Sequence, residues 1–543
     1  MALAVKAPNA PFGTSARVDN GTRVILRTVV TPSLPAGAKV IVRYPWQEGF
    51  QRFAACQFNS CQYWLEYQDG TLAIHASVVS AANEELAKSA SVTVVWAKRA
   101  TPVCRRPSKR RPASVADRPF KGLCVSYEMP ARFGLDENPK DGLIDFLTVK
   151  DGAKIAPATW PVELTVDGGR CDGKATYTWT IDGKDAKHTP KSKCTFTLDF
   201  PKEATYRVEV TAKKTGQPDE TASKEVVVQD FLIVGIGDSL AAGEGVPDRM
   251  APAAGQPATW QDPQCHRSRS SWQAKAALTV EDLRKDVGDK ETSVTFVHIG
   301  CSGATIEHLL RAGYLGIEPG VALEAQVKAF KDLLNNREVD ALLLSVGIND
   351  FRFGDVARFC VENFTCQEDD FEGVTLARWI AARMGELPAR YDRLSAALAL
   401  KPAVKADRIY ITQYPDFLHQ AAGVFCPTIL EDAEWRTELG ANIGAAESEW
   451  LFNNLLVPLN TQIASRAPKK WKLIDGIPAL FLGHGYCAPD AQRWIVRHAE
   501  SLRNQGNENG PLHPNEMGQS RIARLAEKIL KNDLYPGGFT RKP

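Results

Sequence analysis

The strongest constraint on the fold lies in residues 230–543, where short apolar runs alternate with helical patterns. Four runs have the character of buried strands: FLIVGIG, TSVTFVHIG, ALLLSVGI and RIYITQYP. Amphipathic helical patterns lie among them, such as ALEAQVKAFKDLLNN, LARWIAARMGELPARYDRLSAALAL and SRIARLAEKILKN. This alternation predicts an α/β/α three-layer domain built on a parallel sheet. Sites in such sheets form beyond the carboxyl ends of the strands.

Residues 1–97 have a different pattern, that of a small all-β domain. Runs such as TRVILRTVV, AKVIVRYPW and TLAIHASVV are separated by Gly, Pro and Asn turns. We expect a β-sandwich accessory domain here. Residues 98–122 are rich in Pro and Arg and have little to bury, so they are expected to form a linker. Contact of its basic run with anionic glycan or lipid is the alternative interpretation.

Residues 123–229 predict a second small β-sandwich. Runs such as TYRVEVTAK alternate apolar and polar residues, which is typical of a sheet with one buried face. Trp179 lies between Cys171 and Cys194, and this arrangement resembles immunoglobulin-like or polycystic-kidney-disease-type modules. The resemblance implies an accessory or spacer role.

Twelve cysteines occur as spaced couples without a CxxC motif. An even number of this kind favours disulfides, which persist outside the reducing cytosol. The couples in the first two domains, each expected to form a disulfide, are Cys56–Cys61, Cys104–Cys124 and Cys171–Cys194. The start MALAVKAPNAPFG shows no signal peptide. We expect a secreted, periplasmic or cell-surface protein whose signal has been removed.

Two Gly-rich corners follow the first two predicted strands of the C-terminal domain. VGIGDSLAAGEG places Ser239 at a strand end, where Gly237 lets the backbone bend. A helix opening at Leu240 would favour negative charge at the serine oxygen. HIGCSGAT repeats the arrangement, and Gly303 there lets a ligand approach its amide. Each corner alone also fits an ordinary tight turn.

Two further segments place polar side chains at the ends of predicted elements. Asn349 follows the third strand in LLLSVGIND, as a turn residue, a helix cap or a neutral donor to an oxyanion. His513 precedes Pro514 in NGPLHPNEMGQ, and Asn515 can cap the helix that follows. A histidine held in this way is a candidate general base, although a single loop histidine is often incidental.

In this order, GDSL, CSGAT, GIND and HPN resemble the four sequence blocks of the SGNH hydrolases, also called GDSL-type esterases and lipases. The resemblance covers residues 230–543. GEGVPD, CHRSRSSW, YPD and GHGYC are further similar to secreted actinobacterial-type members, in which three disulfides staple the hydrolase domain. The resemblance implies the pairs Cys265–Cys301, Cys360–Cys366 and Cys426–Cys487.

The resemblance also implies the roles of four residues. Ser239 would be the nucleophile and His513 the general base. The amides of Ser239 and Gly303, together with the side chain of Asn349, would form the oxyanion hole.

One position departs from the pattern of the SGNH hydrolases. Many members carry Asp three residues before the catalytic histidine, and Gly510 occupies that place here. We expect the backbone carbonyl of Gly510 to accept the Nδ1–H of His513, as in some secreted members. Glu508 is the alternative.

The leading hypothesis is an exported serine ester hydrolase that cleaves a carboxylic ester. The alternatives are a carbohydrate deacetylase acting on a polysaccharide and, from another class, a surface polymer-binding protein with an inert hydrolase-like domain. The expected substrate is a lipid, a small ester or an acylated glycan, with polymer contact through the N-terminal sandwiches. We expect segments 244–275 and 350–375 to wall the site.

The remaining expectations concern partners and cofactors. The sequence has no HExxH motif, no paired histidine spacing and no GxxxxGK[ST] loop, so we expect neither a metal nor a cofactor. The net charge of +2 gives no indication of nucleic-acid binding. No run approaches the roughly 18 apolar residues of a membrane helix. We expect a monomer.

Overall fold

The computed structural model divides the chain into two compact units, Met1–Cys104 with Ala113–Lys121 and Arg105–Pro112 with Gly122–Pro543. It describes the strand backbones within residues 2–97. Beyond these it describes residues 123–130, 159–166, 175–186, 193–286, 292–334, 337–431, 442–466 and 470–534, with side chains except at 282–286.

The first unit contains two sheets of mainly antiparallel strands. One sheet has the order β1-β3-β6, and the other has the order β2-β9-β7-β4-β5 with β8 paired to β7. The three runs named above as strands form β3, β4 and β7. This two-sheet arrangement is sandwich-like, as expected. The strands are β1 Ala2–Lys6, β2 Ser15–Asp19, β3 Val24–Val29, β4 Lys39–Pro45, β5 Gln51–Cys56, β6 Ser60–Leu65, β7 Gly70–Val79, β8 Glu85–Lys88 and β9 Val92–Ala97.

The second unit begins with another β-sandwich-like domain of two antiparallel sheets, β10-β11-β14 and β13-β12-β15-β16. The expected alternation is confirmed on β15, where Tyr206, Val208 and Val210 are buried. Trp179 on β12 is buried in the core between the sheets. The strands are β10 Val125–Glu128, β11 Trp160–Val166, β12 Ala175–Ile181, β13 Lys184–Asp185, β14 Thr195–Phe200, β15 Ala204–Lys214 and β16 Glu220–Val228.

A hydrogen bond at the edge of this sandwich has no counterpart in the sequence patterns. The hydroxyl of Tyr206 donates to the carbonyl of Lys202 at 2.9 Å. In immunoglobulin-like sandwiches a tyrosine hydroxyl often donates to a backbone carbonyl a few residues earlier in the chain. It fixes the corner between β14 and β15.

The C-terminal domain is built on a five-stranded parallel sheet with the order β18-β17-β19-β22-β25. Its first three strands in the chain are buried along their whole length, because helices cover both faces. The strands are β17 Asp230–Gly237, β18 Ser293–His298, β19 Ala341–Ser345, β22 Ile409–Thr412 and β25 Lys472–Ile474. From β17 the chain first crosses to β18 on one side of it. It then crosses back to β19 on the other side. A crevice therefore opens beyond the carboxyl end of β17.

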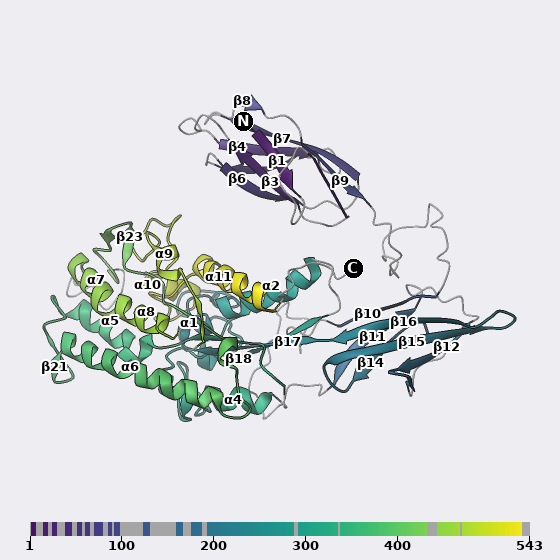
Figure 1. Cartoon of the computed structure of the whole chain (residues 1–543). Coiled ribbons are helices and arrows are strands. Elements are labelled where there is room, and N and C mark those ends of the chain that lie inside the picture. The colour runs from purple at the N-terminus through teal and green to yellow at the C-terminus, as the bar shows by residue number, and fades with distance from the viewer. Residues whose placement is uncertain are drawn as a thin grey trace. The chain divides into compact units, whose positions relative to one another are not determined.

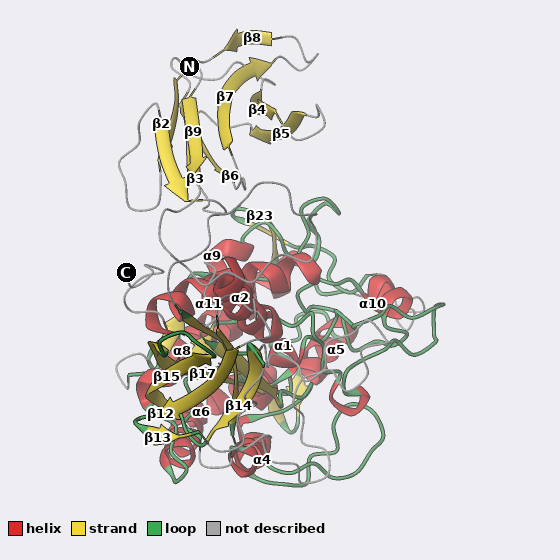
Figure 2. Cartoon of the chain, turned by 90° about the vertical axis from the view of Figure 1, so that its right-hand side faces the viewer, coloured by secondary structure: helices red, strands yellow, loops and turns green. Residues whose placement is uncertain are grey.

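Helices lie on both sides of the sheet, with α2 and α11 on one side and α4 and α6 on the other (Figures 1 and 2). The expected helical patterns form α4, α6 and α11. The helices are α1 Ser239–Ala242, α2 Trp272–Asp286, α3 Ile306–Leu310, α4 Gln326–Leu333, α5 Phe353–Glu362, α6 Leu376–Ala399, α7 Ala445–Leu451, α8 Val457–Ala464, α9 Ile477–Phe481, α10 His498–Asn504 and α11 Glu516–Leu534. Two hairpins complete the domain, β20 Asp370–Phe371 with β21 Val374–Thr375 and β23 His419–Ala421 with β24 Val424–Phe425.

Three disulfides link parts of this domain, and they have the expected partners: Cys265–Cys301, Cys360–Cys366 and Cys426–Cys487. Cys124 and Cys194 are also disulfide-bonded. Their expected partners, Cys104 and Cys171, lie outside the described residues, as do the linker 98–122 and the side chains of Cys56 and Cys61. Among the described helices, none combines the length and apolar character that crossing a bilayer requires.

Candidate active site

The corner after β17 presents Ser239 as the first residue of α1. Gly237 has a φ of +134°, and a Cβ there would overlap the carbonyl oxygen of Ser345, so only glycine fits. Asp238 caps α1 by accepting a hydrogen bond from the amide of Leu240 at 3.1 Å. The backbone therefore turns sharply from strand to helix and places the mostly buried serine side chain at the turn, where it lines a pocket.

This corner is fixed by groups on both sides. The side-chain amide of Gln326 bonds to both the N–H and the carbonyl of Gly237 at 2.8 Å. The pairing of β17 with β18 ends at Gly235, so Gln326 bonds to a part of β17 that β18 does not pair with. On the other side, the amide of Asp238 donates to the carbonyl of Ser345 at 2.8 Å. The hydroxyl of Tyr414 donates to the buried carboxyl of Asp238. Burial raises the pKa of Asp238 to about 7.

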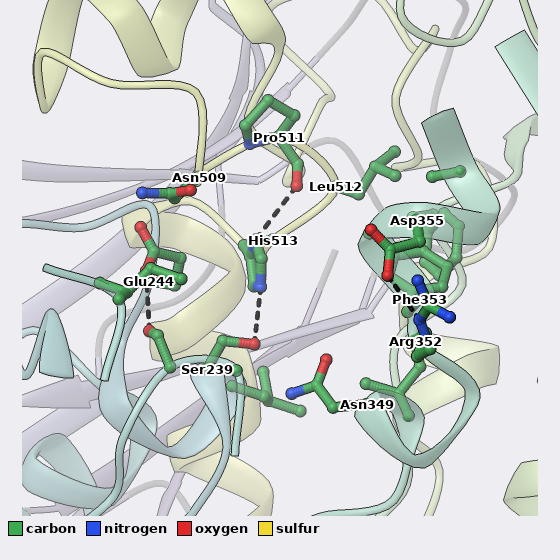
Figure 3. Close-up of a pocket in the computed structure, with 18 of the residues that line it drawn as sticks. Ser239, Glu244, Asn349, Arg352, Phe353, Asp355, Asn509, Pro511, Leu512 and His513 are labelled. Atoms are coloured by element: carbon green, nitrogen blue, oxygen red, sulfur yellow. Dashed lines mark hydrogen bonds and ion pairs between the residues drawn. The ribbon is translucent and has the colours of Figure 1, made fainter. Parts of the chain in front are cut away.

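The structure brings Ser239 and His513 together. Nε2 of His513 lies 2.7 Å from Oγ of Ser239 (Figure 3). Nδ1 faces two carbonyl oxygens, those of Pro511 at 3.1 Å and Gly510 at 3.3 Å. Because carbonyls only accept, Nδ1 carries the proton and Nε2 is left to accept the proton of the serine hydroxyl. Burial lowers the pKa of His513, which keeps the ring neutral near pH 7.

The expected acceptor for Nδ1 of His513, the carbonyl of Gly510, is present, but it shares this role with a second carbonyl. The carbonyl of Gly510 does face Nδ1, but that of Pro511 is closer. The alternative acceptor, Glu508, lies elsewhere, since its carboxylate is 3.3 Å from Nε2 of His498. Glu508 does not bond to His513, and about half of its side chain is exposed.

Gly303 contributes an amide that can receive negative charge. Its φ is +79°, and a Cβ would overlap the hydroxyl of Tyr314. In its loop the amides of Ser302 and Ala304 donate to backbone carbonyls, whereas in the described part of the chain the amide of Gly303 has no acceptor. The amide of Ser239, at the start of a helix, likewise has no partner within that helix.

Asn349 lies beside this loop on the 3₁₀ turn Ile348–Phe351. Its Nδ2 donates one hydrogen to the carbonyl of Ala304 at 3.2 Å, which leaves the second hydrogen free for a ligand. The next residue, Asp350, fixes the turn. Its carboxylate accepts from the amide of Ile306 at 3.0 Å and pairs with Arg390 at 2.7 Å.

All four predicted residues line one pocket of about 600 Å³. Segment 350–375 lines this pocket in part, through residues of 352–358 at the start of α5 and in the turn before it, whereas residues 359–375 do not reach it. From segment 244–275 only Glu244 reaches it, so that expectation is wrong for most of the segment. The apolar side chains of the wall include Ile348, Phe353, Phe417, Leu430 and Leu512. The arrangement offers a hydroxyl with a base beside it and up to three N–H donors for an oxyanion, which are the groups that acyl transfer needs.

Several residues that hold the site were not singled out from the sequence. Pro511 acts through its carbonyl, which no side-chain pattern reveals. Tyr414 connects two strand ends, since its hydroxyl also accepts from the amide of Ile348 at 3.1 Å. The YPD stretch that contains it was a usable signal. Glu244, in the GEG stretch, was another.

Comparison with known proteins adds no assignment. No protein-family profile matches the chain, and no curated protein matches it. Among solved structures, the chain is similar to the fibronectin(III)-like modules of Clostridium thermocellum CbhA, at 10% identity over 41% of this chain and 92% of that chain, with a TM-score of 0.13. Similarity at this level carries no argument about fold or function.

Proposed function

We propose that the protein is a serine ester hydrolase of the SGNH type that cleaves a carboxylic ester. One observation carries the proposal: Oγ of Ser239 lies 2.7 Å from Nε2 of His513 at the wall of a pocket that Gly303 and Asn349 also line. A hydroxyl becomes a nucleophile when a neutral imidazole takes its proton. A packed, non-functional serine would not need a pocket in front of it.

The reaction proceeds in two steps. Nε2 of His513 takes the proton of Ser239 as Oγ attacks the ester carbonyl, and the developing oxyanion is received by the amides of Ser239 and Gly303 and by Nδ2 of Asn349. The protonated ring then gives its proton to the leaving alcohol, which leaves an acyl group on Ser239. Water, activated by the same ring, hydrolyses this acyl-enzyme and restores the serine.

The pocket favours an ester whose acyl group is larger than acetyl. Its volume of about 600 Å³ and its apolar side chains offer more space than two carbons fill. The rate across p-nitrophenyl esters from acetate to palmitate tests this point. A maximum at acetate would instead favour the deacetylase alternative.

Export and the accessory domains complete the proposal. Three disulfides in the C-terminal domain are compatible with an extracellular location. The N-terminal sandwiches would bring the hydrolase domain to a polymer. Retention of the full chain on insoluble polysaccharides tests this role, with bovine serum albumin as the reference for non-specific adsorption.

The decisive experiment is Ser239→Ala, assayed on p-nitrophenyl butyrate. We expect the rate to fall at least about 10⁴-fold because the nucleophile is lost, with an unchanged melting temperature. Ser465→Ala, at an exposed serine after α8, is the matched control and should keep the wild-type rate. Full activity of Ser239→Ala would reject the assignment.

A further inference from the structure

A buried carboxylate that the proposed mechanism does not use lies next to the site. Glu244 is 1% exposed, and three side chains donate hydrogen bonds to it. They are Nδ1 of His266 at 2.8 Å, Oγ of Ser302 at 2.7 Å and Nε2 of Gln505 at 2.7 Å. Burial raises the pKa of Glu244, but the hydrogen bond and charge of His266 outweigh it, so the pKa lies below its ordinary value. Glu244 is therefore an anion.

His266 is the cation that accompanies it. Its Nδ1 faces Glu244, and its Nε2 lies 3.2 Å from the carboxylate of Glu318. Because carboxylates only accept, both ring nitrogens carry protons and the ring is charged. The indole of Trp260 stacks on this ring at 4.5 Å and 4°. Burial lowers the pKa of His266, but Glu244 and Glu318 raise it by more, so the pKa lies above its ordinary value.

Glu244 lies close to the base without bonding to it. The next residue, Gly245, packs against His513, since a Cβ on Gly245 would be 3.4 Å from the Cβ of His513. Figure 3 shows Glu244 on one side of His513, with Arg352 and Asp355 on the opposite side. The carboxylate thus acts on the ring through space.

A second connection runs through the loop before the base. Gln505, which donates to Glu244, also donates to Oδ1 of Asn507 at 2.6 Å. Oγ of Ser501 donates to the carbonyl of Asn507 at 2.6 Å and accepts from the amide of Gly510 at 3.0 Å. Glu244 is therefore linked to the residue whose carbonyl helps to orient the ring.

We propose that Glu244 is a positioning residue for the base: its buried negative charge stabilises protonated His513, and its bond to Gln505 holds the loop whose carbonyls orient the ring. The inference rests on the proposed function, in which His513 takes up the proton of Ser239. A carbonyl carries only a partial charge, so a base oriented by carbonyls alone lacks the ionic partner that a triad carboxylate supplies. A fixed charge in a poorly screened interior can replace it from a neighbouring position.

Other charged groups face His513, and each has its own partner. His266 opposes Glu244, but the influence of Glu244 on His513 is the larger. On the side of α10, His498 and Glu508 pair at 3.3 Å. Across the pocket, Arg352 and Asp355 pair at 2.7 Å. Glu244 is thus the charge that dominates at the ring.

The test measures the rate at which a fluorophosphonate labels Ser239 as a function of pH, by mass spectrometry of the intact full chain. In Glu244→Gln the anion is lost, so protonated His513 becomes less stable. The acidic limb of the profile of labelling rate against pH should then move to lower pH by about 0.5–1 unit. The labelling rate on the plateau of this profile should fall about 3–10-fold. The matched control is Glu318→Gln, which removes the other carboxylate of His266 and should leave the limb in place.

A second variant keeps the test decisive if Glu244→Gln folds poorly. In His266→Asn the cation is lost while the Asn side chain can still donate to Glu244, so the limb should move to higher pH. A purely structural role predicts slower labelling in both variants with an unmoved limb, and that result would overturn the inference alone. Absence of labelling in the wild-type chain would overturn the proposed function, and the inference with it.

Discussion

The serine and the histidine of the site are held in contrasting ways. Ser239 follows β17, all of whose residues are buried, and the end of that strand is bonded to Gln326 on one side and Ser345 on the other. His513 follows no strand of the sheet. It lies on the loop between α10 and α11, which an isolated bridge between Ile495 and Pro514 connects to the preceding chain.

This difference separates two kinds of requirement. Ser239 follows directly on a fully buried strand, so we expect a substitution beside it to lower the stability of the fold. The position of His513 depends on hydrogen bonds of its loop and on bonds from that loop to Val496 and Glu244, so we expect a change in the loop to affect the chemistry before the folding. The same substitution, glycine to alanine, can be made on each side to test the contrast.

Gly237→Ala should have the largest effect. The residue has a φ of +134°, and the new Cβ would overlap the backbone oxygen of Ser345, which cannot move without moving β19. We expect the free energy of unfolding to fall by more than about 3 kcal/mol, measured by urea denaturation, with loss of soluble protein. Gly385→Ala is the control, because Gly385 is exposed within α6 with no atom within 4 Å. It should gain about 0.5–1 kcal/mol. Wild-type stability of Gly237→Ala would remove the contrast.

Gly510→Ala should have a smaller effect of a different kind. Its new Cβ would lie 2.7 Å from Oγ of Ser501 and 3.0 Å from Oε1 of Gln505, which are side-chain atoms and not backbone atoms of the sheet. We expect the stability to change by less than about 1 kcal/mol, while kcat/KM falls about 10-fold because the carbonyl that faces His513 is displaced. A loss of stability as large as that of Gly237→Ala would show that the histidine loop belongs to the core as well.

The smallest effect concerns pH. In the proposed mechanism His513 must be neutral, and burial lowers its pKa, so activity should be lost only as the pH falls below about 6.5, the ordinary pKa of histidine. Asp238, whose pKa is raised to about 7, is a second group that could set the limb. Asp238→Asn keeps the helix cap and removes that titration. If the acidic limb of the activity profile stays in place in this variant, the limb reports the titration of His513. If the limb disappears, it reports the titration of Asp238.

The sequence predicted those parts of the site that follow from regular structure. Ser239, Gly303 and Asn349 each follow an apolar run, and parallel strands bring their carboxyl ends to one edge of the sheet. The structure places all three at the pocket. Asn515 also caps α11 as expected, by accepting from the amides of Met517 and Gly518 at 3.1 Å.

Other parts could not be predicted, for physical reasons. The strand β25 has three residues, Lys472–Ile474, too few for a periodic signal. The carbonyl of Pro511 belongs to the backbone, whose orientation depends on a left-handed Leu512 with a φ of +68°. Nothing in a leucine indicates that conformation. The bond between Glu244 and Gln505 joins positions 261 apart, and no local pattern encodes such a contact.

The bond between Cys265 and Cys301 has a consequence for where the protein can work. It joins the segment of His266 to the segment of Gly303, and the amide of Ser302 adds a hydrogen bond to the carbonyl of Cys265 at 3.0 Å. Disulfides form and persist mainly in oxidising surroundings. A newly made, still reduced chain has the serine and the histidine but lacks the covalent frame around them. The covalent frame of the pocket is in this way complete only after these two thiols have been oxidised.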